Sequence, residues 1–374
     1  MNIGERLRYA RERARLTGAQ IRERTGIGES SLSEFENGKR EPSLSQLRTL
    51  ARACSRSVVF FMSEGPIPTE IVLWREQPSA GAGEIEVKFL RLCEQYHNLE
   101  IWTKEKSPIR LPVADVDTDK NRFGYPQAEE LAKSFRRELQ LGDHPAHALL
   151  NVLEEICGVK VFHLEFEPTG TAASTFSETF GPAILLNSHN CRWRRNHDLA
   201  HELFHLLTWR LFRESLQSDV RAAEATEREE NLATCFARHL LMPADPLRTA
   251  VNARMNEGKV RFEDLFDIAR EFDVSIESLL WHVHFLYGRS SAQADKTRED
   301  IVRAKTLALM FEDRSQAPVP GRPARFHALA IKALRRGEIS IGRCAEYLGA
   351  SRQQVMKYVE QEAMDNEEIQ VAPA

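Results

Sequence analysis

The five residues His201-Glu202-Leu203-Phe204-His205 constrain this chain more than any other segment. In a helix, side chains four residues apart lie on one face, so the imidazoles of His201 and His205 can bind one metal ion, and zinc is the usual ion for such a pair. Glu202 lies beside them and can accept a proton from water at the ion. Residues 196–209 contain no proline or glycine and have an apolar face, which predicts a buried helix. The pattern indicates the site of a metallopeptidase.

A second predicted helix, residues 229–243, offers a third metal ligand. A catalytic zinc site commonly has three protein ligands and one open position for water, so a carboxylate from a neighbouring helix would complete it. We expect Glu230 to be this ligand, because the small Ala233 follows on the same face and lets the two helices approach closely. Glu229 is the alternative. Zn²⁺ is the expected cofactor, and Mn²⁺ is the alternative metal.

His197 precedes His201 by four residues, so three histidines follow one another at intervals of four: His197, His201 and His205. A straight helix rises about 12 Å over eight residues. That is too far for His197 and His205 to share an ion at a zinc–nitrogen distance of about 2.0–2.1 Å. We therefore expect His197 to be a polar neighbour of the site or a solvated side chain, and not a ligand.

Residues 125–285 resemble the ImmA/IrrE family of bacterial metallo-endopeptidases. Three segments carry the resemblance: Gly181–Asn187, Leu199–Leu207 and Glu230–Pro243. The chain departs from the family's pattern at His197, where an aromatic residue is usual, and at Thr234, where asparagine is usual. The resemblance implies a zinc-peptidase core.

The resemblance also implies roles for individual residues. It makes His201, His205 and Glu230 the metal ligands and Glu202 the general base. In zinc peptidases an edge strand beside the active helix holds the substrate by backbone pairing. We expect the predicted strand 181–187 to be this edge, with an ordinary sheet strand as the alternative. The expected substrate-binding residues are Ala183, Ile184, Leu185 and Leu186.

The first 57 residues differ in charge from the rest of the chain. Twelve Lys and Arg against seven Asp and Glu give them a net charge of +5, whereas the whole chain carries −4, so the remainder carries −9. Such a segment suits a polyanion. Its helix-capping and helix-breaking residues predict four short helices, with a turn at Gly26-Ile27-Gly28 and a helix end at Asn37-Gly38. This spacing is typical of a helix-turn-helix domain.

This N-terminal segment resembles the XRE family of Cro/C1-type repressor domains. The resemblance is carried by Gly4–Leu7, Leu16-Thr17, Thr25–Ile27, Leu32–Ser43 and Leu47–Ala51. It implies that residues 29–36 lie in the major groove of DNA.

The residues expected at the DNA interface follow from this resemblance. Ser30, Ser31 and Ser33 would lie near bases or phosphates, with Lys39 and Arg40 at the backbone and Gln20 near a phosphate. The recognition segment also carries Glu29, Glu34 and Glu36, which repel phosphates unless they are paired. A repressor-like module used for dimerisation or partner recognition is the alternative.

Length and composition fit an ordinary globular protein. The chain has 374 residues, of which 42% are hydrophobic and 28% charged, which suits two or three domains. No apolar run reaches the roughly 18 residues of a spanning helix and no signal peptide is apparent, so we expect a cytoplasmic protein without membrane contact. The six cysteines are scattered, which predicts reduced thiols and no cysteine-based zinc site.

The expected fold class is mainly α, with a small α+β zinc-peptidase core, an N-terminal all-α helix-turn-helix domain and a helical C-terminal region. The expected domains are a DNA-binding domain at 1–74, a linker and connecting helix at 75–124, a peptidase domain at 125–290 and C-terminal helices at 291–374.

These patterns together predict a transcriptional regulator joined to a zinc endopeptidase that cuts a specific regulatory protein, such as a repressor. Its expected partners are a DNA operator, that protein substrate and a second copy of the chain in a homodimer. Two alternatives remain: a non-catalytic, antitoxin-like regulator with a structural metal site, and a metal sensor that tunes DNA affinity. The intact Glu202 favours the enzyme, because a structural site needs no base and usually has a fourth protein ligand.

Overall fold

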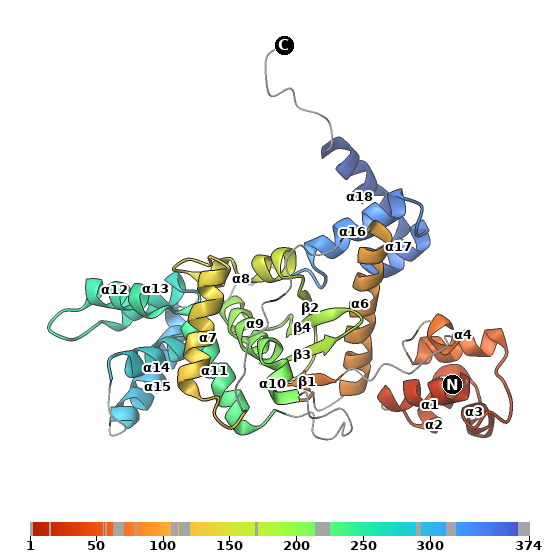
Figure 1. Cartoon of the computed structure of the whole chain (residues 1–374), viewed down its shortest axis with the longest axis horizontal. Helices are drawn as coiled ribbons and strands as arrows, with labels where there is room; N and C mark the ends of the chain where they lie inside the picture. Colours follow the sequence, from red (N-terminus) through yellow and green to blue (C-terminus); the bar gives the residue numbers. More distant parts are fainter. Residues whose placement is uncertain are drawn as a thin grey trace, which may run out of the picture.

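The computed structural model confirms the expected fold class, since it is mainly helical with one small sheet. Figure 1 shows the strands at the centre of the molecule, with helices on either side. The described residues are 3–14, 16–54, 56, 58–62, 71–78, 81–105, 111, 120–168, 171–213, 225–288, 293–311 and 319–365.

The N-terminal head is a bundle of short helices around its own core. Thr17 and Ser43 begin two of the helices through capping boxes, and Gly26, with a φ of 72°, ends the second helix in the left-handed conformation that glycine adopts without strain. Leu7 and Phe35 are among its fully buried side chains. The helices are α1 (Ile3–Arg13), α2 (Gly18–Thr25), α3 (Glu29–Glu36), α4 (Leu44–Ala53) and α5 (Val58–Met62).

The sheet has four strands in the described part of the chain, in the order β1-β3-β4-β2. β3 pairs antiparallel with β1 and with β4, whereas β4 pairs parallel with β2. The strands are β1 (Val72–Trp74), β2 (Lys160–Leu164), β3 (Ala172–Ser177) and β4 (Gly181–Asn187). β1 and β3 were not predicted from the sequence.

The prediction that residues 181–187 form an edge strand is wrong. β4 lies inside the sheet, and its backbone pairs with β3 on one side and β2 on the other. All four predicted substrate-binding residues are at most 1% exposed. Their backbone groups are used by the sheet, so these residues cannot add a substrate strand: Ala183, Ile184, Leu185 and Leu186.

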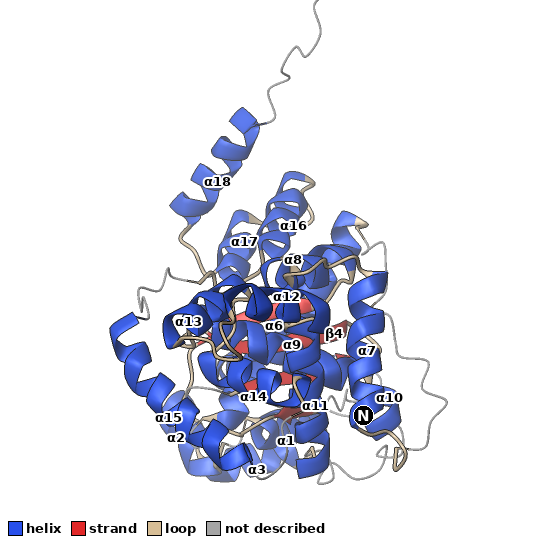
Figure 2. Cartoon of the chain, turned by 90° about the vertical axis from the view of Figure 1, so that its left-hand side faces the viewer, coloured by secondary structure: helices blue, strands red, loops and turns tan. Residues whose placement is uncertain are grey.

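Side chains of β4 alternate between two hydrophobic cores. Ile184 and Leu186 face the core that contains α9 (Arg192–Leu207) and α11 (Glu227–Leu241), whereas Ala183 and Leu185 face the core that contains α6 (Ala82–Thr103) and α16 (Ala324–Arg335). Helices therefore cover both faces of the sheet, and Figure 2 shows the strands enclosed by helices. This double burial explains the continuous apolar run of β4.

The first face is covered by the helices that carry the metal-binding motif and by those around them. They are α7 (Tyr125–Glu138), α8 (Leu149–Asn151), α9 (Arg192–Leu207), α10 (Trp209–Arg213), α11 (Glu227–Leu241), α12 (Ala244–Arg254), α13 (Phe262–Glu271), α14 (Ile276–Leu286) and α15 (Ala294–Phe311). The segment 146–157, predicted as one helix, is a 3₁₀ turn, a short α-helix and a π-helix in succession.

The second face is covered by α6 (Ala82–Thr103), α16 (Ala324–Arg335), α17 (Ile341–Leu348) and α18 (Arg352–Asp365). A largely buried ionic cluster joins α6 and α16 to the sheet. Glu100 of α6 lies 3.0 Å from the Lys160 ammonium of β2 and 2.6 Å from the Arg325 guanidinium of α16. α16 is therefore packed against the sheet, where Phe326 also lies beside Phe162 of β2.

Two predicted domain boundaries change as a result. β1 was assigned to the DNA-binding domain, but it pairs with β3 of the central sheet. The segment 75–124 was assigned as a linker, but α6 within it buries one face against the sheet and contributes Val87 to the core of the head. We place the first boundary before Ile71.

Candidate metal centre

The motif helix α9 lies at the centre of the first core. It packs against β3, β4 and α11, and Leu199 and Leu203 are buried on its apolar side. His201 and His205, one turn apart, have ring centroids 5.2 Å from each other. They are 0% and 2% exposed, so this pair is buried inside the protein.

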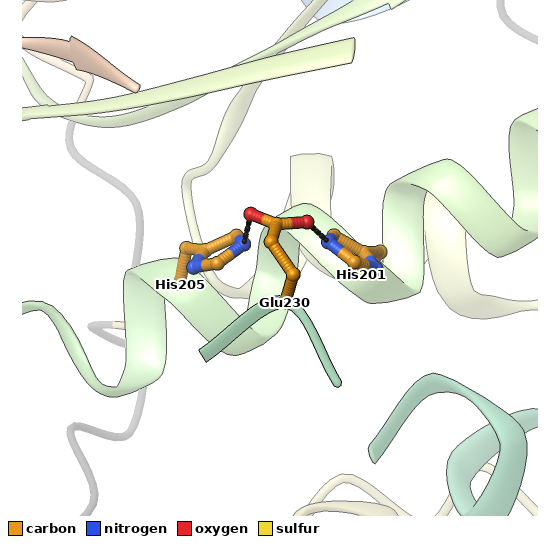
Figure 3. Close-up of side chains that lie close together, drawn as sticks. All are labelled: His201, His205 and Glu230. Atoms are coloured by element: carbon orange, nitrogen blue, oxygen red, sulfur yellow. Dashed lines mark hydrogen bonds and ion pairs between the residues drawn. The ribbon is translucent and has the colours of Figure 1, made fainter. Parts of the chain in front are cut away.

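Glu230, in the first turn of α11, lies between the two imidazoles (Figure 3). One carboxylate oxygen is 2.9 Å from His201 Nε2, and the other is 3.4 Å from His205 Nε2. The candidate ligand atoms of His201, His205 and Glu230 all lie within 4.8 Å of one another. The structure thus brings together the three residues predicted as ligands.

Glu229 occupies a different position. Its carboxylate is 3.0 Å from His205 Nδ1, the ring nitrogen that does not face Glu230. It also accepts a hydrogen bond from Arg213 Nη2 at 2.7 Å. Because it contacts the outer nitrogen of His205, Glu229 is not placed as a third ligand.

Glu202 is fully buried and points from α9 to the sheet. Its Oε2 accepts a 2.7 Å hydrogen bond from the hydroxyl of Ser174 on β3. Burial raises the pKa of Glu202 to about 7, while the neighbouring His205 and the Ser174 hydrogen bond act in the opposite direction. A carboxyl group with a pKa near neutrality is suited to exchange protons with a substrate.

The charges of the three candidate ligands are coupled. Burial lowers the pKa of His201 to about 3. Burial would also lower the pKa of His205, but its hydrogen bond with Glu229 and the close carboxylate of Glu230 raise it to about 9. Partial burial would raise the pKa of Glu230, but its hydrogen bond with His201 and its ion pair with His205 hold that pKa below its usual range. Two imidazoles and one carboxylate are a ligand set that zinc accepts.

Three polar atoms of this cluster lack a hydrogen-bond partner among the described residues, and they indicate whether a metal ion would fit. His205 Nε2, Glu230 Oε1 and Glu202 Oε1 are buried and form no hydrogen bond within the part of the chain that the structure describes. Buried polar atoms normally have partners. A divalent cation with a water molecule would supply them, so the residues present fit a catalytic metal.

Asp198 is fully buried one turn before His201. It accepts hydrogen bonds from Asn190 Nδ2 at 2.8 Å and from Arg75 Nη1 at 3.2 Å. His197 lies 3.8 Å from the same carboxylate, which agrees with its predicted place as a polar neighbour. The sequence analysis missed Asp198, Arg75 and Ser174, because the Arg75–Asp198 and Ser174–Glu202 contacts join segments that are distant in the chain.

The recognition helix α3 presents part of the predicted DNA-binding set. Ser30 and Ser33 are exposed and Ser31 is half-buried. Glu36, one of the three acidic residues of this segment, is buried and lies 2.6 Å from Arg11. Its charge is therefore paired inside the head and does not face a phosphate.

The other residues predicted to contact DNA differ in whether their side chains already have partners within the head. Gln20 Oε1 accepts a hydrogen bond from Thr17 N at 2.8 Å in the cap of α2, which leaves its amide nitrogen for a phosphate. Arg40 lies 3.6 Å from Glu34. Lys39 is exposed and forms no ion pair with any described residue. Lys39 is thus the clearest candidate for a contact with the DNA backbone.

Comparison with known families confirms both resemblances. Residues 154–282 match the IrrE N-terminal-like domain, and residues 2–59 match a helix-turn-helix domain. The chain therefore carries a helix-turn-helix domain joined to a peptidase-like domain. More particularly, the second of these is an IrrE-like domain, which agrees with the resemblance to the ImmA/IrrE family.

Comparison with solved structures adds little. PlcR of Bacillus thuringiensis in complex with the peptide PapR7 and DNA aligns at 11% identity over 98% of this chain and 99% of that chain, with a TM-score of 0.17. ComR of Streptococcus suis aligns at 12% identity over 98% of this chain and 97% of that chain, with a TM-score of 0.16. Scores this low carry no argument about this chain. No curated protein matches it, and none of the described helices is long and apolar enough to cross a membrane.

Proposed function

We propose that this protein is a zinc-dependent endopeptidase, joined to a DNA-binding head, that cuts a specific regulatory protein such as a repressor. One observation carries the proposal: His201, His205 and Glu230 converge within 4.8 Å, and an unpartnered oxygen of Glu202 lies beside them. A purely structural site has no need of such a carboxylate. Mn²⁺ is the alternative metal.

His201 Nε2, His205 Nε2 and a carboxylate oxygen of Glu230 would hold the ion. When bound, the ion supplies a Lewis acid that polarises the peptide carbonyl and lowers the pKa of water. Glu202 accepts the proton of the attacking water at Oε1 and returns it to the leaving amine. Ser174 holds the other oxygen of Glu202, which keeps the carboxylate in one orientation.

The head would give this peptidase its selectivity. Binding to DNA, or to a second copy of the chain in a homodimer, raises the local concentration of one substrate. The helix-turn-helix family match and the exposed serines of α3 support DNA binding. Several basic residues of the head are already paired, including Arg11 with Glu36 and Arg24 with Glu84. We therefore expect modest affinity for DNA unless two heads act together.

The test combines metal analysis with a cleavage assay on candidate repressors. Wild-type protein and Glu202→Gln should both retain zinc, and only the wild type should cut, because an amide cannot accept the proton. His201→Ala and His205→Ala should lose the metal. Zinc retained without any cleavage by the wild type would support a structural site. Cleavage by Glu202→Gln at the wild-type rate would reject the assigned base.

A further inference from the structure

The two histidines of the metal centre differ in what holds their outer nitrogens. His205 Nδ1 is 3.0 Å from Glu229 Oε1, and Arg213 Nη2 is 2.7 Å from the same oxygen. The side chains of His205, Glu229 and Arg213 are 1%, 3% and 5% exposed. In contrast, His201 Nδ1 is buried and forms no hydrogen bond with any described residue. Of the two histidines, only His205 thus has a described hydrogen-bond partner at the ring nitrogen that faces away from Glu230.

We propose that Glu229 and Arg213 are a positioning pair that fixes the imidazole of His205 for metal binding. A carboxylate can only accept hydrogen bonds, so His205 Nδ1 donates to Glu229, and Nε2 is the nitrogen whose lone pair would bind the ion once the ion displaces its proton. That nitrogen is the one that faces Glu230. The inference rests on the proposed metal site, and it adds two residues that do not touch the ion.

Three separate elements build this arrangement, one residue from each. His205 is in the last turn of α9, Arg213 ends α10, and Glu229 is in the first turn of α11. Thr226 caps α11 by accepting a hydrogen bond from the Glu229 backbone N–H at 3.2 Å, which fixes the start of that helix. The position of the carboxylate is therefore set by the backbone of α11 as well as by Arg213.

Aromatic packing holds the short helix α10 in place. The ring centroid of Phe212 lies 6.4 Å from that of Phe204, next to His205, and 6.2 Å from that of Phe123. Arg213 follows Phe212 directly and so enters the core beside Glu229. Without Arg213, the buried carboxylate of Glu229 would lose its guanidinium partner and would be freer to turn from His205.

Zinc affinity tests the proposal, measured on the full chain by competition with a chelator. Residues that orient a metal ligand typically affect affinity by about 10–100-fold. We expect a loss of this size in Glu229→Ala. We expect a smaller loss in Glu229→Gln, because its amide oxygen still accepts from both neighbours. Glu227→Ala, an exposed acidic residue on the same turn, is the matched control and should bind as the wild type does.

The contribution of Arg213 is isolated by a double-mutant cycle. Arg213→Ala should weaken zinc binding in the wild-type background and have little further effect in Glu229→Ala, because it acts through that carboxylate. Arg210→Ala, an exposed arginine of the same helix, is its control. Equal losses in both backgrounds would overturn the role of Arg213.

A second readout follows His205 itself in protein labelled with ¹⁵N-histidine. The proton on Nδ1 should exchange slowly with water in the zinc-bound wild type and rapidly in Glu229→Ala. If folded Glu229→Ala binds zinc as tightly as the wild type while Glu230→Ala loses zinc, the positioning role is overturned and the metal site is not. Failure of the wild type to bind zinc would overturn the proposed metal site, and this inference with it.

Discussion

Replacing Glu86 tests whether the head is docked on the peptidase-like unit. Glu86 lies on α6 and is 5% exposed. Its Oε1 accepts a 2.9 Å hydrogen bond from the indole nitrogen of Trp74 on β1, and its other oxygen is 3.5 Å from Arg13 of α1. One buried carboxylate therefore joins the head, α6 and the edge strand of the sheet.

The expected cost follows from these contacts. Glu86→Ala leaves the buried indole N–H without an acceptor, which costs about 1–3 kcal/mol. Loss of the partly buried ion pair with Arg13 adds about 1 kcal/mol. We expect the free energy of unfolding to fall by about 2–4 kcal/mol. Glu86→Gln should cost less, because its amide oxygen still accepts from Trp74.

Urea unfolding, followed by circular dichroism, measures this difference. The control is Glu84→Ala on the same helix, which removes an ion pair with Arg24 of α2. That pair is closer than the one with Arg13, at 2.6 Å against 3.5 Å, but its side chains are 41% and 50% exposed. An exposed pair contributes about 0.2–1 kcal/mol. If Glu86→Ala costs no more than Glu84→Ala, the buried junction does not stabilise the docked head and the reasoning fails.

Three further predictions concern the metal, the DNA and the pH. Glu230→Ala should strip the metal at neutral pH, as elemental analysis would show, and full occupancy would place the third ligand elsewhere. Lys39→Ala should weaken binding to all DNA sequences alike and reduce the number of counterions released on binding by about one, whereas Ser31→Ala should change the preference among operators. Gel shifts at two salt concentrations measure both effects. If the wild type binds no DNA even at low salt, DNA has no part in the mechanism. Burial raises the pKa of Glu154 from 4.5 to about 8. The folded state thus keeps a proton that the unfolded chain releases, and stability from this group, present below pH 4.5, is lost as the pH rises through about 8. Glu154→Gln should flatten this decline in urea unfolding, and Glu155→Gln should flatten it less, because the charge of the exposed Glu155 is the smaller cause of the raised pKa.

Local patterns in the sequence were enough to predict the motif helix and the head. The spacing of His201 and His205 places them on one face of any helix, so it needs no knowledge of the rest of the fold. The turn at Gly26 and the stop at Asn37-Gly38 likewise mark helix ends by residues whose conformational preferences are local. The predicted helix-turn-helix arrangement therefore matches the structure closely.

Tertiary structure alone decided the order of the strands. Strand 181–187 was predicted correctly as a strand and wrongly as an edge, because an apolar run shows burial but does not show which strands lie beside it. β1 is three residues long and β3 is rich in small residues, so neither has a clear periodic signal. Their pairing spans about a hundred residues of chain, which no local pattern reports.

The same limit applies to the metal centre. Periodicity supplied two imidazoles and narrowed the third ligand to Glu229 or Glu230, which are adjacent on one helix. Successive residues of a helix point in directions about 100° apart, so the way in which α11 packs on α9 determines which carboxylate faces which nitrogen of His205. Packing of distant segments also brought Ser174 to Glu202 and Arg213 to Glu229. The sequence determined which chemical groups are present, and the packing determined which of them touch.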